Sequence, residues 1–124
     1  MEFSLDHATG RYQIRSYAPK KITINDTVYS DSLIISPDQL IVPWPVSSLA
    51  ELNHSSLATI NALKPEVVLL GTGRVLQFPA AELLAYFTQQ HIGVEVMDTA
   101  AACRTFNVLT AEGRRVVAAL INDE

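Results

Sequence analysis

The sequence predicts an α/β fold, a single three-layer domain with a central mixed β-sheet flanked by helices and an extra N-terminal β-hairpin. Two patterns support this prediction. The first third of the chain consists of short runs rich in β-branched and aromatic residues, which are typical of strands. The rest alternates apolar runs with segments whose apolar residues repeat at helical spacing. Short strand–helix–strand links favour right-handed crossovers and parallel pairing.

The N-terminal third is expected to contain four short strands. In the first, Tyr12 and Ile14 should share one face, and the alternation could extend this face to Ser16. Asn25-Asp26 follows the second strand, and these residue types are suited to turning it. The fourth contains two prolines, which confine it to an edge or an end of a sheet. These strands are expected at residues 11–17, 21–26, 27–36 and 39–46.

Two helical segments are expected next. A short one begins at Leu49, where Ser47 or Ser48 can act as the N-cap. Residues 55–64 have apolar side chains at helical spacing, and this helix must stop before Pro65.

The middle of the chain then predicts a strand and a third helix. Residues 66–70 run into glycine as a continuous apolar stretch, which is typical of a strand buried on both faces. The helix is expected to begin at Phe78 or Pro79, because proline suits the first helical turn. Gly93 is expected to end it.

The last part of the chain predicts strand, helix and strand. Residues 94–97 form the strand, and Asp98 or Thr99 can cap the helix that follows. Gly113 is expected to close that helix. Residues 114–121 are expected to be the final strand, although they could also be helical.

Length and composition limit the classes of protein that this chain can be. With 124 residues it is expected to form one domain, residues 1–124, with an ordered core over about 10–121. The net charge is −4 and no basic run exceeds two residues, which argues against a nucleic-acid partner. Charged residues make up 18% of the chain, compared with about 25% in typical globular domains. The surface is therefore expected to offer apolar area to a partner.

The cysteine count and the distribution of apolar residues predict where in the cell the protein is found. One cysteine excludes an internal disulfide and fits a reducing compartment. The first seventeen residues show no apolar segment of a secretory signal. The longest uncharged run, Leu83–Gly93, is far shorter than the ~20 apolar residues of a membrane span. We therefore expect a cytoplasmic protein with no membrane span.

Two loops are expected at the carboxyl ends of parallel strands, where ligands bind in such sheets. One is the turn Gly71–Arg74 and the other is Met97–Thr99. If the two strands are neighbours, the loops face each other across a crevice. The candidate site residues in and around it are Gly71, Thr72, Gly73, Arg74, Asp98, Thr99, Cys103, Arg104 and Asn107.

Neither loop carries a specific binding motif. A dinucleotide fingerprint would have its third glycine where Leu76 stands, and the Gly-Lys-Ser/Thr of a P-loop is missing. The following helix also begins too far beyond Gly73 to bind a phosphate there. We favour a tight structural turn, with an anion or small polar ligand as the alternative. At the second loop we favour a helix capped by Asp98 or Thr99 over an anion site.

Cys103 is the one thiol, and it lies about one turn into the last helix beside Arg104. The helix dipole and the guanidinium could both lower its pKa. A catalytic cysteine also needs a base, and no motif ties it to His7, His54 or His91. We therefore interpret it as a buried structural residue. No two His or Cys residues have metal-ligand spacing, so we expect no catalytic residue, no metal and no cofactor.

Residues 97–114, MDTAAACRTFNVLTAEGR, form a distinctive segment. It resembles the family of small domains that includes mitochondrial respiratory complex I assembly factor 3 and many bacterial proteins of unknown function. The Gly71–Gly73 turn and Trp44 match the family pattern as well, and the resemblance covers roughly residues 10–121. Within the segment, the matching residues are Met97, Asp98, Thr99, Ala102, Cys103, Thr105, Phe106, Asn107, Leu109, Glu112, Gly113 and Arg114.

The resemblance implies a three-layer α/β fold with a mixed sheet whose last strand is antiparallel to the rest. It therefore favours a strand at residues 114–121. The mitochondrial members help to build the membrane-associated part of complex I with partner proteins and without known catalysis. The bacterial members have no established activity, so no catalytic residue is implied. This chain shows no mitochondrial targeting segment, which fits a bacterial cytoplasmic member.

Three functions remain open on the sequence alone. The first is a non-catalytic protein-binding or assembly module, with respiratory-complex proteins as the partners that the resemblance implies. The second is a small-molecule or anion-binding protein, or a minor enzyme, that uses the crevice between Gly71–Arg74 and Met97–Thr99. The third is a domain that works only as a homo-oligomer.

Overall fold

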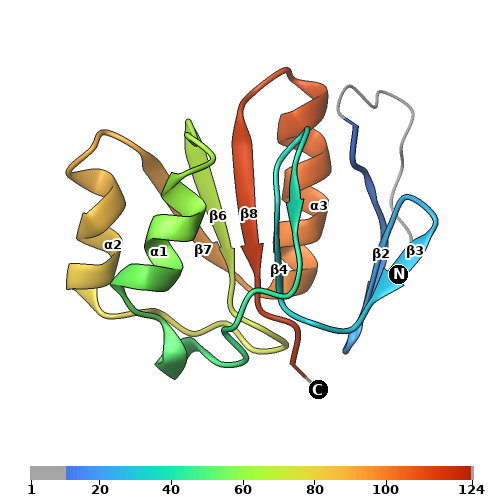
Figure 1. The fold of residues 1–124 in the computed structure, drawn as a ribbon, viewed down its shortest axis with the longest axis horizontal. Coiled ribbons are helices and arrows are strands. Elements are labelled where there is room, and N and C mark those ends of the chain that lie inside the picture. The colour runs from blue at the N-terminus through green and yellow to red at the C-terminus, as the bar shows by residue number, and fades with distance from the viewer. Residues whose placement is uncertain (1–10, 124) are drawn as a thin grey trace.

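The computed structural model describes residues 11–123, which form three stacked layers (Figure 1). Two helices cover one face of a central sheet, and a third helix with a small separate sheet covers the other. The predicted three-layer α/β fold with an extra N-terminal hairpin is confirmed. Two expectations, for the start of the chain and for His7, fall outside the described residues.

The central sheet is mixed. β6 is parallel to both β7 and β8, whereas β4 is antiparallel to β8 and β5, so β4 runs against the other four strands. The predicted strand at 114–121 is confirmed, and the helical alternative is wrong. In spatial order the strands are β5 (Leu40–Ile41), β4 (Leu33–Ile35), β8 (Val116–Leu120), β6 (Val67–Gly71) and β7 (Gly93–Met97).

One expectation that came from the family resemblance is wrong. The last strand, β8, is parallel to β6 and not antiparallel to the rest. The physical reason is the connection that precedes each strand. β8 follows β7 through a helical crossover, which brings the chain back in the same direction. β4 instead enters from the small sheet without a helix, and it is the strand that runs in reverse.

Four helical segments accompany the sheet. Ser48 is the N-cap of the first and Asp98 the N-cap of the last, and both were among the expected caps. Gly113 follows the last helix with a φ of 79°, as predicted for a closing glycine. No helix within residues 11–123 is long and apolar enough to cross a membrane. The segments are the 3-10 helix η1 (Leu49–Glu51), α1 (His54–Asn61), α2 (Ala81–Thr88) and α3 (Thr99–Ala111).

Helix α2 begins later than predicted. The expected start at Phe78 or Pro79 is wrong, because Ala80 is still extended with φ −58° and ψ 144°. Pro79 lies in the extended approach, where it lines an apolar pocket together with Leu52 and Leu83. Packing of the proline ring therefore takes precedence over its preference for a first helical turn.

The end of α2 also differs from the prediction. His91, and not Gly93, takes the left-handed conformation that ends the helical stretch, with a φ of 62°. The N–H of Ile92 then donates to the carbonyl of Phe87 at 3.1 Å, which satisfies one of the free carbonyls at this end. Gly93 becomes the first residue of β7.

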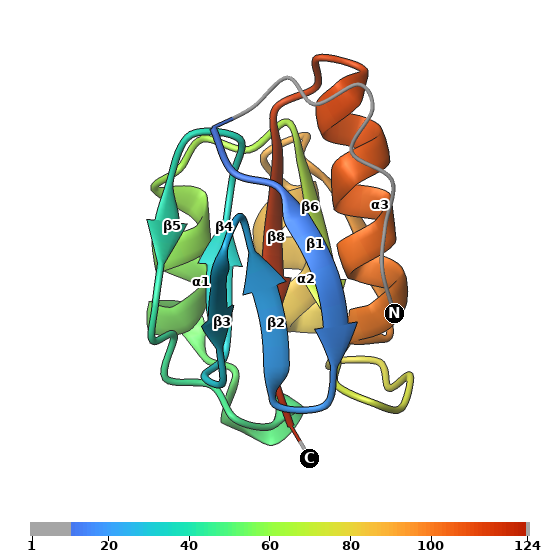
Figure 2. The ribbon, with the colours of Figure 1, turned by 90° about the vertical axis from the view of Figure 1, so that its right-hand side faces the viewer.

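The small sheet contains β1 (Ile14–Ala18), β2 (Lys21–Ile24) and β3 (Thr27–Tyr29), all antiparallel (Figure 2). Asn25-Asp26 forms the predicted turn between β2 and β3, with Asn25 at a φ of 52°. Tyr12 and Ile14 pack on the same core, as predicted, whereas the placement of Ser16 on that face is wrong. The register shifts between Ile14 and Ser16, and this irregularity places Ile14 and Tyr17 in the core.

The extended run predicted over residues 27–36 is divided between two sheets. β3 ends in the small sheet and β4 begins in the central one. Asn122 lies at this crossing and is 1% exposed. Its side-chain oxygen accepts from the Lys20 N–H at 2.9 Å, and its amide nitrogen donates to the carbonyls of Tyr29 and Asp31. One buried side chain therefore ties the end of β8 to the small sheet.

The central strands face two separate cores. Along β6, Val67 and Leu69 point to the layer of α3 and the small sheet, whereas Val68 and Leu70 point to the layer of α1 and α2. β8 alternates in the same way. These strands are buried on both faces, as their continuous apolar sequence predicted.

Candidate functional site

The two loops predicted to face each other do meet. Gly71 is the register partner of Met97, because β6 and β7 are parallel neighbours. Beyond the strands, the N–H of Thr72 donates to the Met97 carbonyl at 2.9 Å, and the N–H of Thr99 donates to the Gly73 carbonyl at 2.9 Å. The loops are thus joined to each other by backbone hydrogen bonds.

The buried side chain of Thr99 closes the junction. Its hydroxyl accepts from the Gly73 N–H at 2.8 Å and donates to the Ile121 carbonyl at 2.7 Å. The N–H of Ile121 in turn donates to the Gly71 carbonyl at 2.9 Å. The residue that follows β8, Ile121, is therefore hydrogen-bonded to both loops.

The glycine turn does bind an anionic group, and that group belongs to the chain itself. The Arg74 N–H donates to the carboxylate of Asp123 at 2.9 Å. Gly73 has a φ of +100°, and a Cβ there would collide with the same carboxylate. A glycine is required at this position both for the conformation and for the close approach of Asp123.

Asp98 caps α3, as predicted. Its carboxylate accepts from the Ala101 N–H at 2.8 Å. Within residues 11–123, neither Asp98 nor Glu112 forms an ion pair with the exposed side chain of Arg74. The backbone donors of this junction are therefore used within the chain, at Thr72, Gly73, Arg74, Thr99 and Ala101.

Three other candidate residues lie along α3, away from the turn. Cys103 is fully buried in the core, and this burial raises its pKa to about 12 even though Arg104 acts in the opposite direction. The thiol is thus neutral at physiological pH. Arg104 is exposed. Asn107 bonds both backbone groups of Ile14, accepting from its N–H at 3.2 Å and donating to its carbonyl at 2.7 Å. It joins α3 to β1.

A second feature was not predicted from the sequence. The loop between β6 and α2 exposes three large apolar side chains, Val75 at 63%, Leu76 at 48% and Phe78 at 70%. An open groove with a volume of about 470 Å³ lies beside Phe78. We call this loop and groove the apolar surface. The groove is lined by Leu49, Ala50, Leu52, Gln77, Phe78, Pro79, Ala80 and Leu83.

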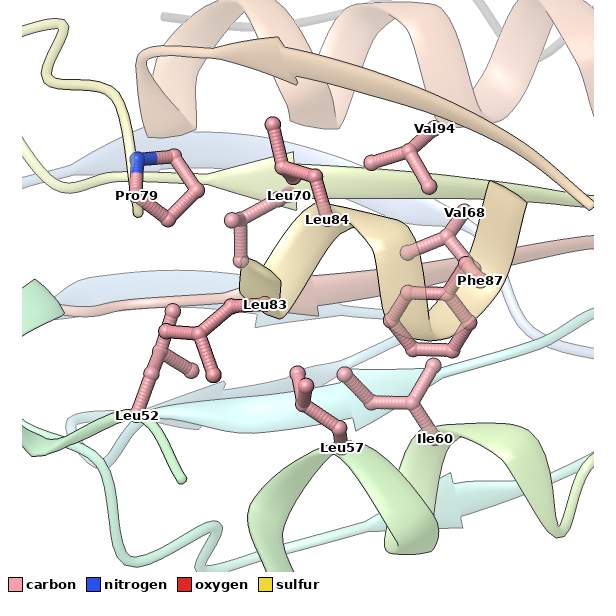
Figure 3. Close-up of a pocket in the computed structure, with 10 residues that line it drawn as sticks. All are labelled: Leu52, Leu57, Ile60, Val68, Leu70, Pro79, Leu83, Leu84, Phe87 and Val94. Atoms are coloured by element: carbon pink, nitrogen blue, oxygen red, sulfur yellow. The ribbon is translucent and has the colours of Figure 1, made fainter. Parts of the chain in front are cut away.

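An apolar pocket lies between the two helices of this layer and shares Leu52, Pro79 and Leu83 with the groove (Figure 3). Side chains of Leu57 and Ile60 from α1 and of Leu83 and Phe87 from α2 point toward one another above β6. The void among them is only about 10 Å³, so it has room for at most one water-sized sphere. The pocket is therefore nearly filled by its own side chains. A group larger than a water molecule has room in the outer groove and not in this pocket.

A signal for the apolar surface was present in the sequence. Val75, Leu76 and Phe78 stand between a glycine turn and a proline, where a loop is expected to be polar. The sequence reasoning considered this stretch for its glycines and for the start of a helix. Because Phe78 was assigned to the helix, its exposure was missed.

Comparison with known proteins gives the family. The model of a family described as "Protein of unknown function (DUF498/DUF598)" matches residues 14–121. The chain belongs to this family. The match extends from β1 to the end of β8 and so includes both the loop junction and the apolar surface.

Individual proteins with similar sequences add to this family assignment. An NADH dehydrogenase [ubiquinone] 1 alpha subcomplex assembly factor 3 from Danio rerio is 40% identical over 87% of this chain and 63% of its own length. The chain thus spans less than two thirds of that assembly factor. A "13 kDa major membrane protein" of Francisella tularensis is 28% identical over 86% of this chain and 88% of its own length. The recognised resemblance to complex I assembly factor 3 and bacterial relatives is confirmed.

A solved structure confirms the fold. The crystal structure of a protein from Bordetella parapertussis has a TM-score of 0.86 and 38% sequence identity to this chain. The alignment covers 94% of this chain and 99% of that protein.

Proposed function

We propose that this chain is a non-catalytic protein-binding module that uses its apolar surface to hold a protein partner during assembly of a larger complex. The observation that carries the proposal is the exposure of Val75, Leu76 and Phe78 on a loop whose residues 77–80 line a mainly apolar groove. Monomeric soluble proteins rarely expose contiguous large apolar side chains in this way, and such patches mark interaction sites.

The relatives support the class of partner. The name of the Danio rerio relative assigns it to the assembly of NADH dehydrogenase. We propose a comparable role here, with a subunit of a respiratory complex as the partner and the cytoplasm as the place of action. The exposed loop would cover an apolar surface of that subunit until another subunit replaces it.

The alternative of a ligand-binding crevice has less support. Its backbone donors at Gly73 and Arg74 are used by Thr99 and Asp123. A ligand would have to displace the chain's own carboxylate and a buried hydroxyl.

Site-directed photo-crosslinking tests the proposal. A photoreactive amino acid would replace Phe78 in one variant and Val108 in the other, because Val108 is also exposed, at 55%, but lies on α3. We expect the position 78 variant to cross-link in cells to a subunit or assembly intermediate of a respiratory complex, and the position 108 variant not to. Equal cross-linking from both positions would contradict a binding face at the apolar surface. Cross-links from position 78 to a second copy of the chain alone would favour a homo-oligomer.

A further inference from the structure

The layer that carries the apolar surface differs in charge from the rest of the molecule. Residues 43–63 and 75–103 contain no Lys or Arg. These two segments supply η1, α1, the exposed loop after Arg74, α2 and β7, together with the start of α3 on the other face of the sheet. The charged residues within them are Glu51, Glu82, Glu95 and Asp98. The chain's nine basic residues all lie outside these two segments in the sequence. The guanidinium of Arg115 nevertheless donates to the carbonyl of Leu63 beyond the end of α1, and Leu63 does not line the groove.

Two of these carboxylates belong to residues that are sequence neighbours of the groove lining. Glu51 stands between Ala50 and Leu52, and Glu82 directly precedes Leu83. Both glutamates are exposed. The lining of the groove is mainly apolar, and we call these two neighbouring exposed glutamates the acidic rim.

Local interactions stabilise the negative charges of Glu51 and Glu82. The Glu51 carboxylate accepts from the hydroxyl and the N–H of Ser47, both at 2.6 Å, and from the Ser48 N–H at 3.2 Å. The hydrogen bonds from Ser47 keep the pKa of Glu51 below its ordinary value. Glu82 lies in the first turn of α2, where the helix dipole favours a negative charge.

Two residues that can carry a positive charge, Arg74 and His54, belong to the segments around the apolar surface. Arg74 begins the loop and is exposed. His54 lies at the start of α1, with its ring 6.0 Å from that of Tyr86. Neither residue is among those that line the groove.

We propose that the groove binds a short segment of a partner protein whose apolar side chains are flanked by Lys or Arg. The lining requires apolar side chains, and the acidic rim favours basic flanks through complementary potential. The same rim disfavours acidic segments and anionic lipid headgroups, because binding would bring like charges together. This inference rests on the proposed function and names the chemistry of the partner.

Peptide binding to the full chain tests the inference. The probes are three fluorescein-labelled peptides of equal length with the same leucine pattern, whose flanking residues are all Lys, all Gln or all Glu. Fluorescence polarisation would give affinities, and NMR chemical-shift changes would give the binding face. We expect the Lys peptide to bind at residues 49–52 and 77–83 and the Glu peptide to bind at least about tenfold more weakly.

Two charge-reversal variants separate a local effect from net charge. Glu82→Lys changes the rim, whereas Glu112→Lys changes net charge equally on an exposed residue after α3. We expect Glu82→Lys to weaken the Lys peptide by at least about fivefold and Glu112→Lys to leave it nearly unchanged. Equal effects of the two variants would overturn the inference, because the attraction would then be general.

The other outcomes separate this inference from the proposed function. If the Glu peptide binds the groove as tightly as the Lys peptide, the charge preference is wrong while a protein-binding groove remains. If no peptide shifts the groove resonances, the inference is wrong, and the proposed function is judged by cross-linking at position 78. Tighter binding to phosphatidylglycerol vesicles than to the Lys peptide would overturn the inference in favour of a membrane surface.

Discussion

The hydroxyl of Thr99 is buried against the turn at Gly73, whose N–H donates to it at 2.8 Å. The same hydroxyl donates to the Ile121 carbonyl at 2.7 Å. One small side chain at the start of α3 therefore satisfies backbone groups from the turn after β6 and from the end of β8. This explains why the Gly73 N–H is not available to a ligand and why a threonine is the first residue of α3.

Loss of the Thr99 hydroxyl should be costly. Thr99→Val keeps the shape of the side chain but leaves the N–H of Gly73 and the carbonyl of Ile121 buried without a partner. We expect the free energy of unfolding to fall by about 2–4 kcal/mol, since each stranded group costs about 1–3 kcal/mol. Thr99→Ser, which keeps the hydroxyl, should cost only about 1 kcal/mol. Urea denaturation measures both, and equal losses would show that the hydrogen bonds contribute little.

Two glycines at strand ends should respond differently to alanine. A Cβ at Gly71 would lie 3.0 Å from the Thr99 hydroxyl oxygen and 3.1 Å from a methyl carbon of Leu120, so we expect Gly71→Ala to cost about 1–3 kcal/mol. A Cβ at Gly93 would meet only Val67, at 3.7 Å. Gly93→Ala should be neutral or stabilise by up to about 1 kcal/mol. Thermal unfolding of the two variants compares them, and a tolerant Gly71 would mean that the junction can widen.

The capping carboxylate and the neighbouring arginine should act independently. Asp98→Ala removes the acceptor of the Ala101 N–H and should cost about 0.5–2 kcal/mol. Arg74→Ala should cost less than about 0.5 kcal/mol, because the bond to Asp123 comes from its backbone N–H, which alanine retains. The double variant should equal the sum of the singles within about 0.5 kcal/mol. A clear departure from additivity would reveal coupling across the junction.

Cys103 should be unreactive in the folded protein. Its burial raises the pKa to about 12, so the folded thiol stays neutral while the unfolded thiol ionises from about pH 9. The sign follows directly: the thiol's contribution to stability is complete below the unfolded pKa and is lost as pH rises toward the folded value. At pH 8 a disulfide reagent should label the native protein far more slowly than the unfolded chain. Rapid native labelling would contradict this burial.

The sequence predicted that the two loops of the candidate crevice lie next to each other, but it did not predict which residues occupy the space between them. The two loops face each other because parallel neighbouring strands end at the same edge, which the pattern of apolar runs indicated. What lies between them came from residues with no visible motif. Ile121 and Asp123 reach the junction only because β8 pairs beside β6. That pairing depends on distant parts of the chain, so no local pattern could indicate it.

Local chemistry was enough to predict several elements. The buried strand β6, the Asn25-Asp26 turn, the Asp98 cap and Gly113 after α3 all follow from side-chain spacing, capping or backbone freedom within a few residues. The direction of β4, the ends of α2 and the exposure of Phe78 became visible in the folded chain alone. Each of these depends on packing between segments far apart in the chain, where the burial of one surface leaves another open to a partner.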